Sequence, residues 1–238
     1  MKRFTFLLVL VALLAGAASA AFASESTLPP FKRMAPQRME LWQHGSPYWW
    51  KMLNLAAADT DAVLSLGACD SAAATTISTG FTAWTTTRNL TLTVSALGSS
   101  DNDIDAVQCV VTGTNALGAA ITETFTAFTN NTEGTVTGST AFASITSIDI
   151  PAMAGDSIAV SIGIGNKIGA PFTSAFDDNY IKAWVGGATE TTGPTVEYSA
   201  TDIELNTYDF NTDPDGSKDY DVLMFIPPYS STSAASKW

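Results

Sequence analysis

Apolar and polar residues alternate along much of the chain after about residue 61. The cleanest case is 156–165, where Ile158, Val160, Ile162 and Ile164 share one face and small residues occupy the other. A period of two is typical of a strand that is buried on one side only. We therefore expect a strand here, with its isoleucine and valine face turned toward a core.

Shorter alternating runs precede and follow this strand, and turn-forming residues such as Gly98, Asn130-Asn131 and Gly186-Gly187 separate them. Many short strands with regular turns predict an all-β fold, and specifically an antiparallel β-sandwich of jelly-roll or immunoglobulin-like type. The other expected strands cover residues 88–97, 105–114, 120–129, 142–150, 180–185, 195–198, 203–208 and 220–226.

Composition agrees with this pattern. Apolar residues make up 46% of the 238 residues, while charged residues make up only 14%, against about a quarter in average proteins. Threonine, serine, alanine and glycine fill the difference. Threonine is β-branched and favours strands, whereas long helices need more leucine, glutamate, lysine and arginine.

The first 23 residues read as a signal peptide. Lys2 and Arg3 precede a short apolar stretch, and 18–20 and 21–23 both match small-x-small cleavage sites. An uncleaved anchor is the alternative, since residues 4–23 carry no charge and are just long enough to span a bilayer. After signal removal we expect no membrane association, a β-sandwich body over 52–228 and a flexible tail over 229–238.

Residues 24–51 form a predicted arm, broken by prolines yet rich in aromatic residues. Tryptophan and tyrosine are enriched in binding hot spots, which predicts a docking contact on a neighbouring subunit. Packing of the same side chains on their own domain is the alternative. The predicted interface residues are Phe31, Trp42, Tyr48, Trp49 and Trp50.

Charge is unevenly distributed between the arm and the body. Residues 25–51 carry four basic and two acidic residues, a net of +2, whereas residues 52–238 carry five basic and twenty-one acidic residues, a net of −16. An acidic body repels phosphate backbones, so nucleic acid is not an expected partner. The basic arm could instead contact the acidic body of another copy, or be an ordinary solvated linker.

Cys69 and Cys109 are the only cysteines. In an exported protein a single pair is a disulfide candidate. Cys109 shares the apolar face of Val107 and Val111, so a small buried hydrophobe is the alternative. Spacing alone does not decide between them.

Few residues suggest chemistry. The only histidine, His44, lies in the arm, and no phosphate loop or nucleophile motif is present. We therefore predict no enzyme, no catalytic residue and no cofactor, apart from a weak calcium candidate at Asn211, Asp213 and Asp215. The alternative for this loop is a β-turn over 214–216.

Five stretches of the chain, in order, resemble β-rich virion structural or decoration-like proteins of tailed bacteriophages and prophages. The resemblance covers roughly residues 52–226 and rests on 88–91, 111–115, 120–124, 141–148 and 163–171. It implies a capsid-associated, self-assembling structural protein whose partners are itself or other virion proteins, and it brings no catalytic residues. The signal-like start departs from that family's pattern.

Together these observations predict a non-enzymatic structural protein that acts by self-association, located in a virion or outside the cell. A secreted or cell-surface β-sandwich that binds glycans or proteins is the second interpretation. A third is an exported hydrolase that uses two acidic residues.

Overall fold

The computed structural model describes residues 46–98, 100–155, 157–173 and 180–226. Predictions for the signal segment, for the tail and for the arm as far as residue 45 lie outside these residues. Within them the chain forms strands and two short 3-10 helices, Asp101–Asp103 and Ile203–Leu205, with no α-helix. All strand pairs are antiparallel. The all-β prediction is thus confirmed for the described residues.

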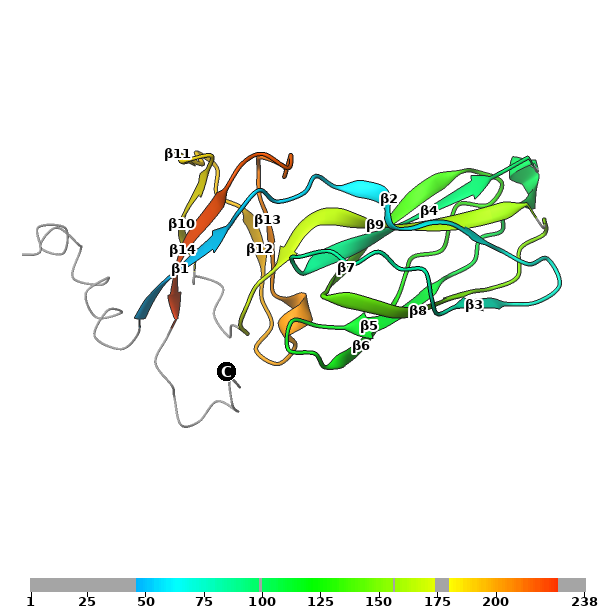
Figure 1. The fold of residues 1–238 in the computed structure, drawn as a ribbon, viewed down its shortest axis with the longest axis horizontal. Helices are drawn as coiled ribbons and strands as arrows, with labels where there is room; N and C mark the ends of the chain where they lie inside the picture. The colour runs from blue at the N-terminus through cyan, green and yellow to red at the C-terminus, as the bar shows by residue number, and fades with distance from the viewer. Residues whose placement is uncertain (1–45, 99, 156, 174–179, 227–238) are drawn as a thin grey trace, which may run out of the picture. The chain divides into compact units, whose positions relative to one another are not determined.

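Three sheets make up this part of the chain (Figure 1). Sheet A has the order β1-β14-β10-β11, and sheet C has the order β3-β8-β5-β6. Sheet B has the order β12-β13-β9-β4-β7, with β2 also paired to β9. The bounds in sheet A are β1 Ser46–Met52, β10 Tyr180–Val185, β11 Ala188–Thr189 and β14 Tyr220–Ile226. In sheet B they are β2 Asp59–Ala68, β4 Arg88–Ala96, β7 Gly134–Phe142, β9 Ile158–Gly169, β12 Thr195–Glu197 and β13 Thr207–Asp209. In sheet C they are β3 Thr75–Ile77, β5 Val110–Thr114, β6 Ala120–Thr124 and β8 Ser144–Ile150.

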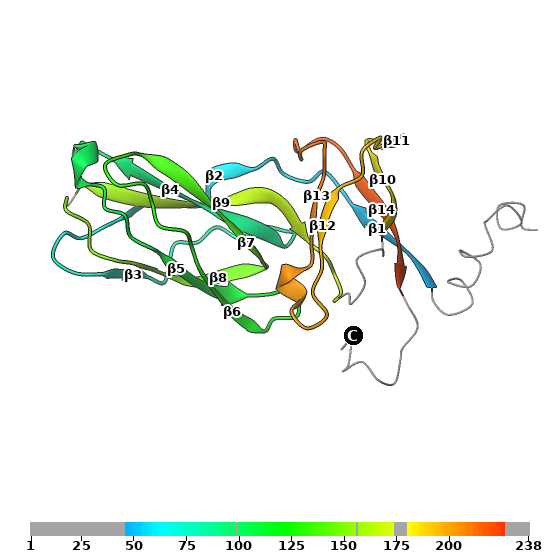
Figure 2. The ribbon, with the colours of Figure 1, turned by 180° about the vertical axis from the view of Figure 1, so that it is seen from behind.

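Sheets B and C face each other, as Figures 1 and 2 both show, and we call the pair the two-sheet body. Its core is mainly aliphatic, because the alternating strands of both sheets turn their β-branched residues and leucines inward. The fully buried members include Leu90, Leu92 and Ile162 from sheet B, and Val111 and Ile148 from sheet C.

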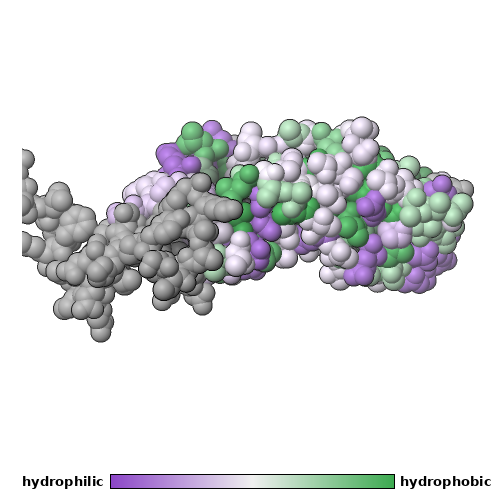
Figure 3. Space-filling view, turned by 90° about the horizontal axis from the view of Figure 1, so that it is seen from below, coloured by the Kyte–Doolittle hydropathy of each residue, from purple (hydrophilic) through white to green (hydrophobic). Residues whose placement is uncertain are grey.

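The outward positions of the two-sheet body carry threonine and serine. Hydroxyls pair across strands, as in Thr93 with Thr135 at 2.7 Å and Thr114 with Ser144 at 2.7 Å. On the face seen in Figure 3, hydrophilic and apolar residues are interspersed rather than separated. On strands such as β8 the two faces therefore differ as the alternating sequence predicts. Strand β9 does not follow this pattern, because Ala159 and Ser161 on its other face are buried as well. The expectation that this strand is buried on one side only is wrong.

A second core lies between sheet A and the C-terminal end of β9. It contains Met52, Val222 and Met224 from sheet A, together with Ile168 and Tyr208 from sheet B. Strand β9 therefore contributes to both cores, since Ile164 and the residues before it belong to the first.

Arg88, the first residue of β4, is 2% exposed and has no carboxylate bound to it. Its guanidinium donates from Nε to the carbonyl of Gly165 at 2.8 Å, from Nη2 to the same carbonyl, and from Nη1 to the carbonyl of Ala56 at 3.0 Å. Burial lowers the pKa of Arg88 to about 10. The Arg88 side chain thus connects β4 to the segment between β1 and β2, in which Ala56 lies.

Several strands differ from the sequence prediction. The last residues assigned to the arm, 46–51, are part of β1, and strands β2, β3, β7 and β11 were not expected. Residues 203–208 were predicted as one strand but form a 3-10 turn followed by β13. These differences occur where alternation is weak, or where the strand pairs with residues far away in sequence.

Candidate functional site

The outer face of sheet A carries exposed aromatic side chains. In the ladder, Trp49 lies opposite Leu223, while Lys182 and Trp184 of β10 lie opposite Leu223 and Asp221. Because directly opposed residues share a face, these five side chains lie on the same side of the sheet. The hydrophobic alternation of β1, β10 and β14 turns their other residues inward to the second core.

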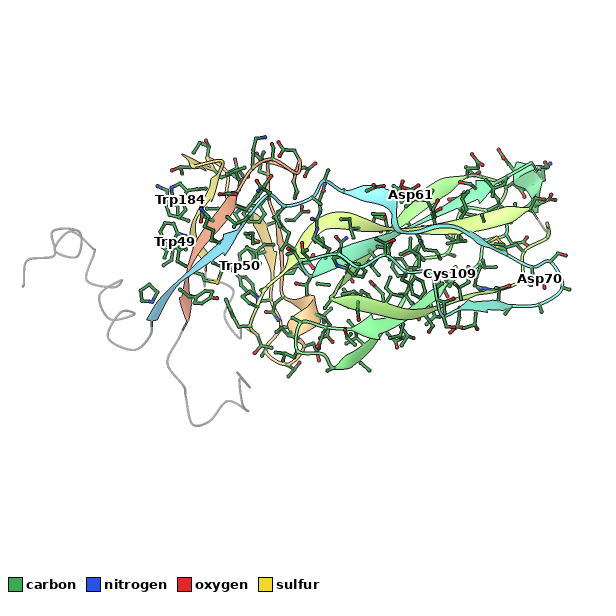
Figure 4. The ribbon with its side chains drawn as sticks, in the orientation of Figure 1. Trp49, Trp50, Asp61, Asp70, Cys109 and Trp184 are labelled. Carbon is green, nitrogen blue, oxygen red and sulfur yellow. The ribbon has the colours of Figure 1, made fainter. Side chains whose placement is uncertain are left out.

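Trp49 and Trp184 stack on each other across β14. Their ring centroids are 5.0 Å apart and the rings are inclined by only 15°, an arrangement worth roughly 0.5–1.5 kcal/mol beyond burial. Figure 4 shows the two indoles side by side. Trp49 nevertheless remains 56% exposed, so much of its surface is left for another molecule.

Two charged groups hold this stack. The indole Nε1 of Trp49 donates to the Asp221 Oδ1 at 3.0 Å. The Lys182 ammonium lies 5.6 Å from the ring centroid of Trp184, within cation–π range. The tryptophans are therefore fixed before any partner arrives, which lowers the entropy cost of binding.

The predicted interface residues do not form one surface. Trp49 is on the outer face, whereas Trp50 points to the other side of β1 and packs edge-on against Tyr208 at 5.7 Å (Figure 4). Tyr48 packs edge-on against Phe172 at 5.8 Å. Phe31 and Trp42 lie outside the described residues. Sequence reasoning missed Trp184, since only the pairing of β10 with β14 brings it to Trp49.

Strand β1 is at the end of sheet A. It pairs with β14 along all seven residues, and within the described residues no strand pairs with its other edge. Unpaired strand edges expose backbone donors and acceptors to other chains. Pro47 lacks an N–H, and Lys51 adds a charge that is bound to Asp219 at 3.2 Å, so the edge is partly protected.

Two of the calcium candidates, Asp213 and Asp215, contact groups of the protein itself. Asp215 Oδ1 accepts from the Ser217 backbone N–H at 2.9 Å and its Oδ2 accepts from Lys218 Nζ at 2.6 Å. These donors hold the pKa of Asp215 well below its ordinary value. Asp213 uses its backbone carbonyl to accept from Tyr220. In the described part of the chain, no three His, Cys, Asp or Glu side chains cluster as a metal site. Asp215 thus forms an Asx turn closed by an ion pair, and the calcium site stays an untested prediction.

Cys69 and Cys109 are free thiols buried in the same core. Burial raises the pKa of Cys69 to about 11, and burial together with the neighbouring Cys69 raises the pKa of Cys109 to about 12. Neither thiol is poised as a nucleophile at neutral pH. Their mutual influence places them near each other, but the disulfide remains a prediction.

Acidic residues approach one another at the start of β2. The Asp61 backbone N–H donates to Asp59 Oδ1 at 3.2 Å, and hydrogen bonding and repulsion from Asp59 raise the pKa of Asp61. Both residues are exposed, and Figure 4 shows Asp61 and Asp70 well apart from each other and from the tryptophans. This exposed pair gives no support to the interpretation of the protein as a hydrolase, and that interpretation remains untested.

No protein-family model, no curated protein and no solved structure matches the chain. No helix in the described segments is both long and apolar enough to cross a bilayer.

Proposed function

We propose that this protein is a non-enzymatic structural component that acts by self-association, of the virion accessory or decoration type that its sequence resembles. Its body is then a sandwich of jelly-roll or immunoglobulin-like kind. Its place of action is a virion or the extracellular space, and its partners are further copies of itself or other structural proteins.

The observation that supports this proposal most is the outer face of sheet A. A preformed pair of tryptophans, half open to solvent and next to an unpaired strand edge, has the composition and rigidity of a binding hot spot. The two charged groups of this face, Asp221 and Lys182, are engaged with the tryptophans, and contact with a second protein requires only shape, apolar area and hydrogen bonds.

Charge supplies a second argument for contact between copies. The arm is basic and the body carries a net charge of −16. The last residues assigned to the arm, 46–51, are part of β1. Attraction between one copy's arm and the next copy's body would weaken as salt screens it.

The test is light scattering on the purified exported protein over a range of concentrations, with electron microscopy of the same samples. We expect assemblies larger than a monomer. Trp49→Ala with Trp184→Ala should weaken association roughly 30-fold, the equivalent of about 2 kcal/mol at a hot spot.

Leu97→Ala is the matched control, since Leu97 is 52% exposed and follows β4 at the end opposite Arg88, the residue that bonds to the segment after β1. It should leave association unchanged. A protein that is monomeric at every concentration and salt tested would overturn the proposal. If the control variant loses as much association as the tryptophan variant, the tryptophans are not the hot spot of the interface.

A further inference from the structure

A groove of about 570 Å³ lies between the C-terminal end of β1 and the two-sheet body. Its volume is within the range of small-molecule sites, about 300–1,000 Å³. Five stretches of chain line it: 50–53, 84–87, Ala116, Ala143 and the segment around Gly169 and Pro171. It belongs to neither the aromatic face of sheet A nor the acidic turns.

Two indoles form its apolar walls. Trp50 is fixed by its edge-on contact with Tyr208, and Trp84 packs against the core of the two-sheet body. Both are partly buried, so each ring is held in place while part of it remains accessible. Rigid aromatic walls of this kind bind flat or weakly polar ligand faces at a low entropy cost.

The polar groups are mainly neutral. Thr85, Thr86 and Thr87 follow Trp84 directly and line the groove. A threonine hydroxyl both donates and accepts; the Thr87 hydroxyl already donates to the Gly169 carbonyl at 3.1 Å, which leaves its oxygen to accept. A neutral ligand with hydroxyl groups can therefore both donate hydrogen bonds to these threonines and accept hydrogen bonds from them.

Trp84 contributes apolar surface and not a hydrogen bond. Its indole Nε1 is enclosed by protein, whereas the residue as a whole is only partly buried. A ligand in the groove therefore contacts the carbon atoms of this ring, and the threonine hydroxyls supply the polar contacts.

Electrostatics disfavour anionic ligands in the groove. Lys51 is the only cation that lines the groove within the described residues, and Asp219 already neutralises it at 3.2 Å. The rest of the body is strongly acidic, so an anion would be repelled. A purely apolar ligand would desolvate the threonine hydroxyls without replacing their hydrogen bonds.

We propose that this groove binds a neutral saccharide, whose C–H face lies against the tryptophans and whose hydroxyls bind to Thr85, Thr86 and Thr87. This site is independent of self-association, because Trp50 and Trp84 lie on the opposite side of β1 from Trp49 or in the body.

The experiment titrates the full-length exported protein with a panel of neutral oligosaccharides built from hexoses and N-acetylhexosamines, followed by calorimetry and tryptophan fluorescence. Uronic-acid and sialylated oligosaccharides are the charged comparison. We expect saturable binding of at least one neutral member. Absence of binding by every neutral member at millimolar concentration would overturn the proposal, as would a preference for the charged ones.

Two variants locate the site. Trp84→Phe reduces the aromatic wall of the groove, and Thr86→Val removes one hydroxyl at nearly constant volume. Each should weaken binding about three- to tenfold, through lost aromatic contact in the first variant and one lost hydrogen bond in the second. The matched control is Trp49→Phe, on the outer face, which should leave binding unchanged.

Circular dichroism and light scattering on the same variants separate this site from the association surface. Both groove variants should retain the fold and the oligomeric mass of the parent protein. If Trp84→Phe alone unfolds the chain, Thr86→Val decides the result. If Trp49→Phe weakens binding as much as the groove variants do, the saccharide binds on sheet A and the groove assignment is wrong.

Discussion

The two-sheet body and sheet A are built from the same kind of strand but differ in what they bury and expose. The body buries aliphatic residues such as Leu92 and Ile162 and exposes threonine. Sheet A buries Tyr220 and Met224 on one face and leaves a tryptophan stack on the other. Alternation separates buried apolar from exposed polar residues on body strands such as β8, whereas on sheet A the outer face carries tryptophans.

The difference has a structural basis. An antiparallel sheet that is buried on one face and solvated on the other has polar residues outside. Sheet A departs from this rule on its outer face, and an exposed apolar surface is a sign of a binding partner. The body therefore supplies stability, and sheet A supplies the contact surface that we propose. Four experiments test this division.

The largest expected effect is Leu92→Ala in the body. Leu92 is completely buried between sheets B and C, so its truncation should cost about 2–5 kcal/mol of unfolding free energy. Because β9 contributes to both cores, urea unfolding followed by circular dichroism and by tryptophan fluorescence should shift together. Leu97→Ala, at a residue 52% exposed, should cost less than about 0.5 kcal/mol. Separate transitions for the two probes would show that sheet A unfolds independently.

Oxidation of the body should have the next largest effect. If Cys69 and Cys109 pair after export, the bridge should add about 2–4 kcal/mol. Dithiothreitol should then lower the urea midpoint of the parent protein and leave that of Cys109→Ala unchanged. Thiol labelling of denatured, non-reduced protein from an oxidising compartment counts the free thiols per chain directly. Two free thiols per chain would exclude the bridge.

Arg88→Met tests the connection between the two regions. The change leaves the carbonyls of Gly165 and Ala56 without their donors, at a cost of about 1–3 kcal/mol. The cost is partly offset because methionine avoids the burial of a charge. Hydrogen exchange should increase in β1 more than in β4. Unchanged stability would mean that desolvation of the guanidinium cancels its hydrogen bonds; Arg88→Lys, which keeps the charge, is the comparison.

The smallest effect is that of pH, and it should concentrate beside sheet A. Burial raises the pKa of Glu190 and of Asp209 above their ordinary values of 4.5 and 3.8. The folded state then binds more protons than the unfolded state, so these groups add stability as pH falls from 7 through their raised pKa values. Both side chains are only partly buried, and solvent still screens them, so we expect less than about 1 kcal/mol.

Glu190→Gln with Asp209→Asn should flatten the dependence of the melting temperature between pH 7 and pH 5. Asp215 does not interfere, because the stability from its lowered pKa is lost only below about its ordinary value of 3.8. If the melting temperatures of the parent protein and the variant change equally between pH 7 and pH 5, Glu190 and Asp209 do not supply the pH dependence.

The sequence predicted some strands of each region. Strands β4, β10 and β14 begin and end within one residue of the expected positions because their alternation is strong and local, while β9 extends four residues further than expected. Strand β2 was missed because its pairing with β9 is interrupted twice by register shifts, which break the period of two.

The candidate site was predicted only in part. Trp49 was identified from composition, but its partners Trp184 and Asp221 come from strands more than 130 residues away. Hydrophobic pattern carries no information about which distant strands pair. The groove was not predicted either, since Trp84 and its threonines lie in an irregular segment where no periodicity marks a surface.

The pairing of β1 with β14 has a consequence for how the chain is made. Ser46 and Ile226 are direct partners in the ladder, so the first and last described strands begin and end side by side. During synthesis or translocation, β1 must wait for nearly the whole chain before its partner exists, whereas β4 meets β7 much sooner. A circular permutant that joins these two ends with a short linker would make β1 and β14 a hairpin, and sheet A would then form from local contacts.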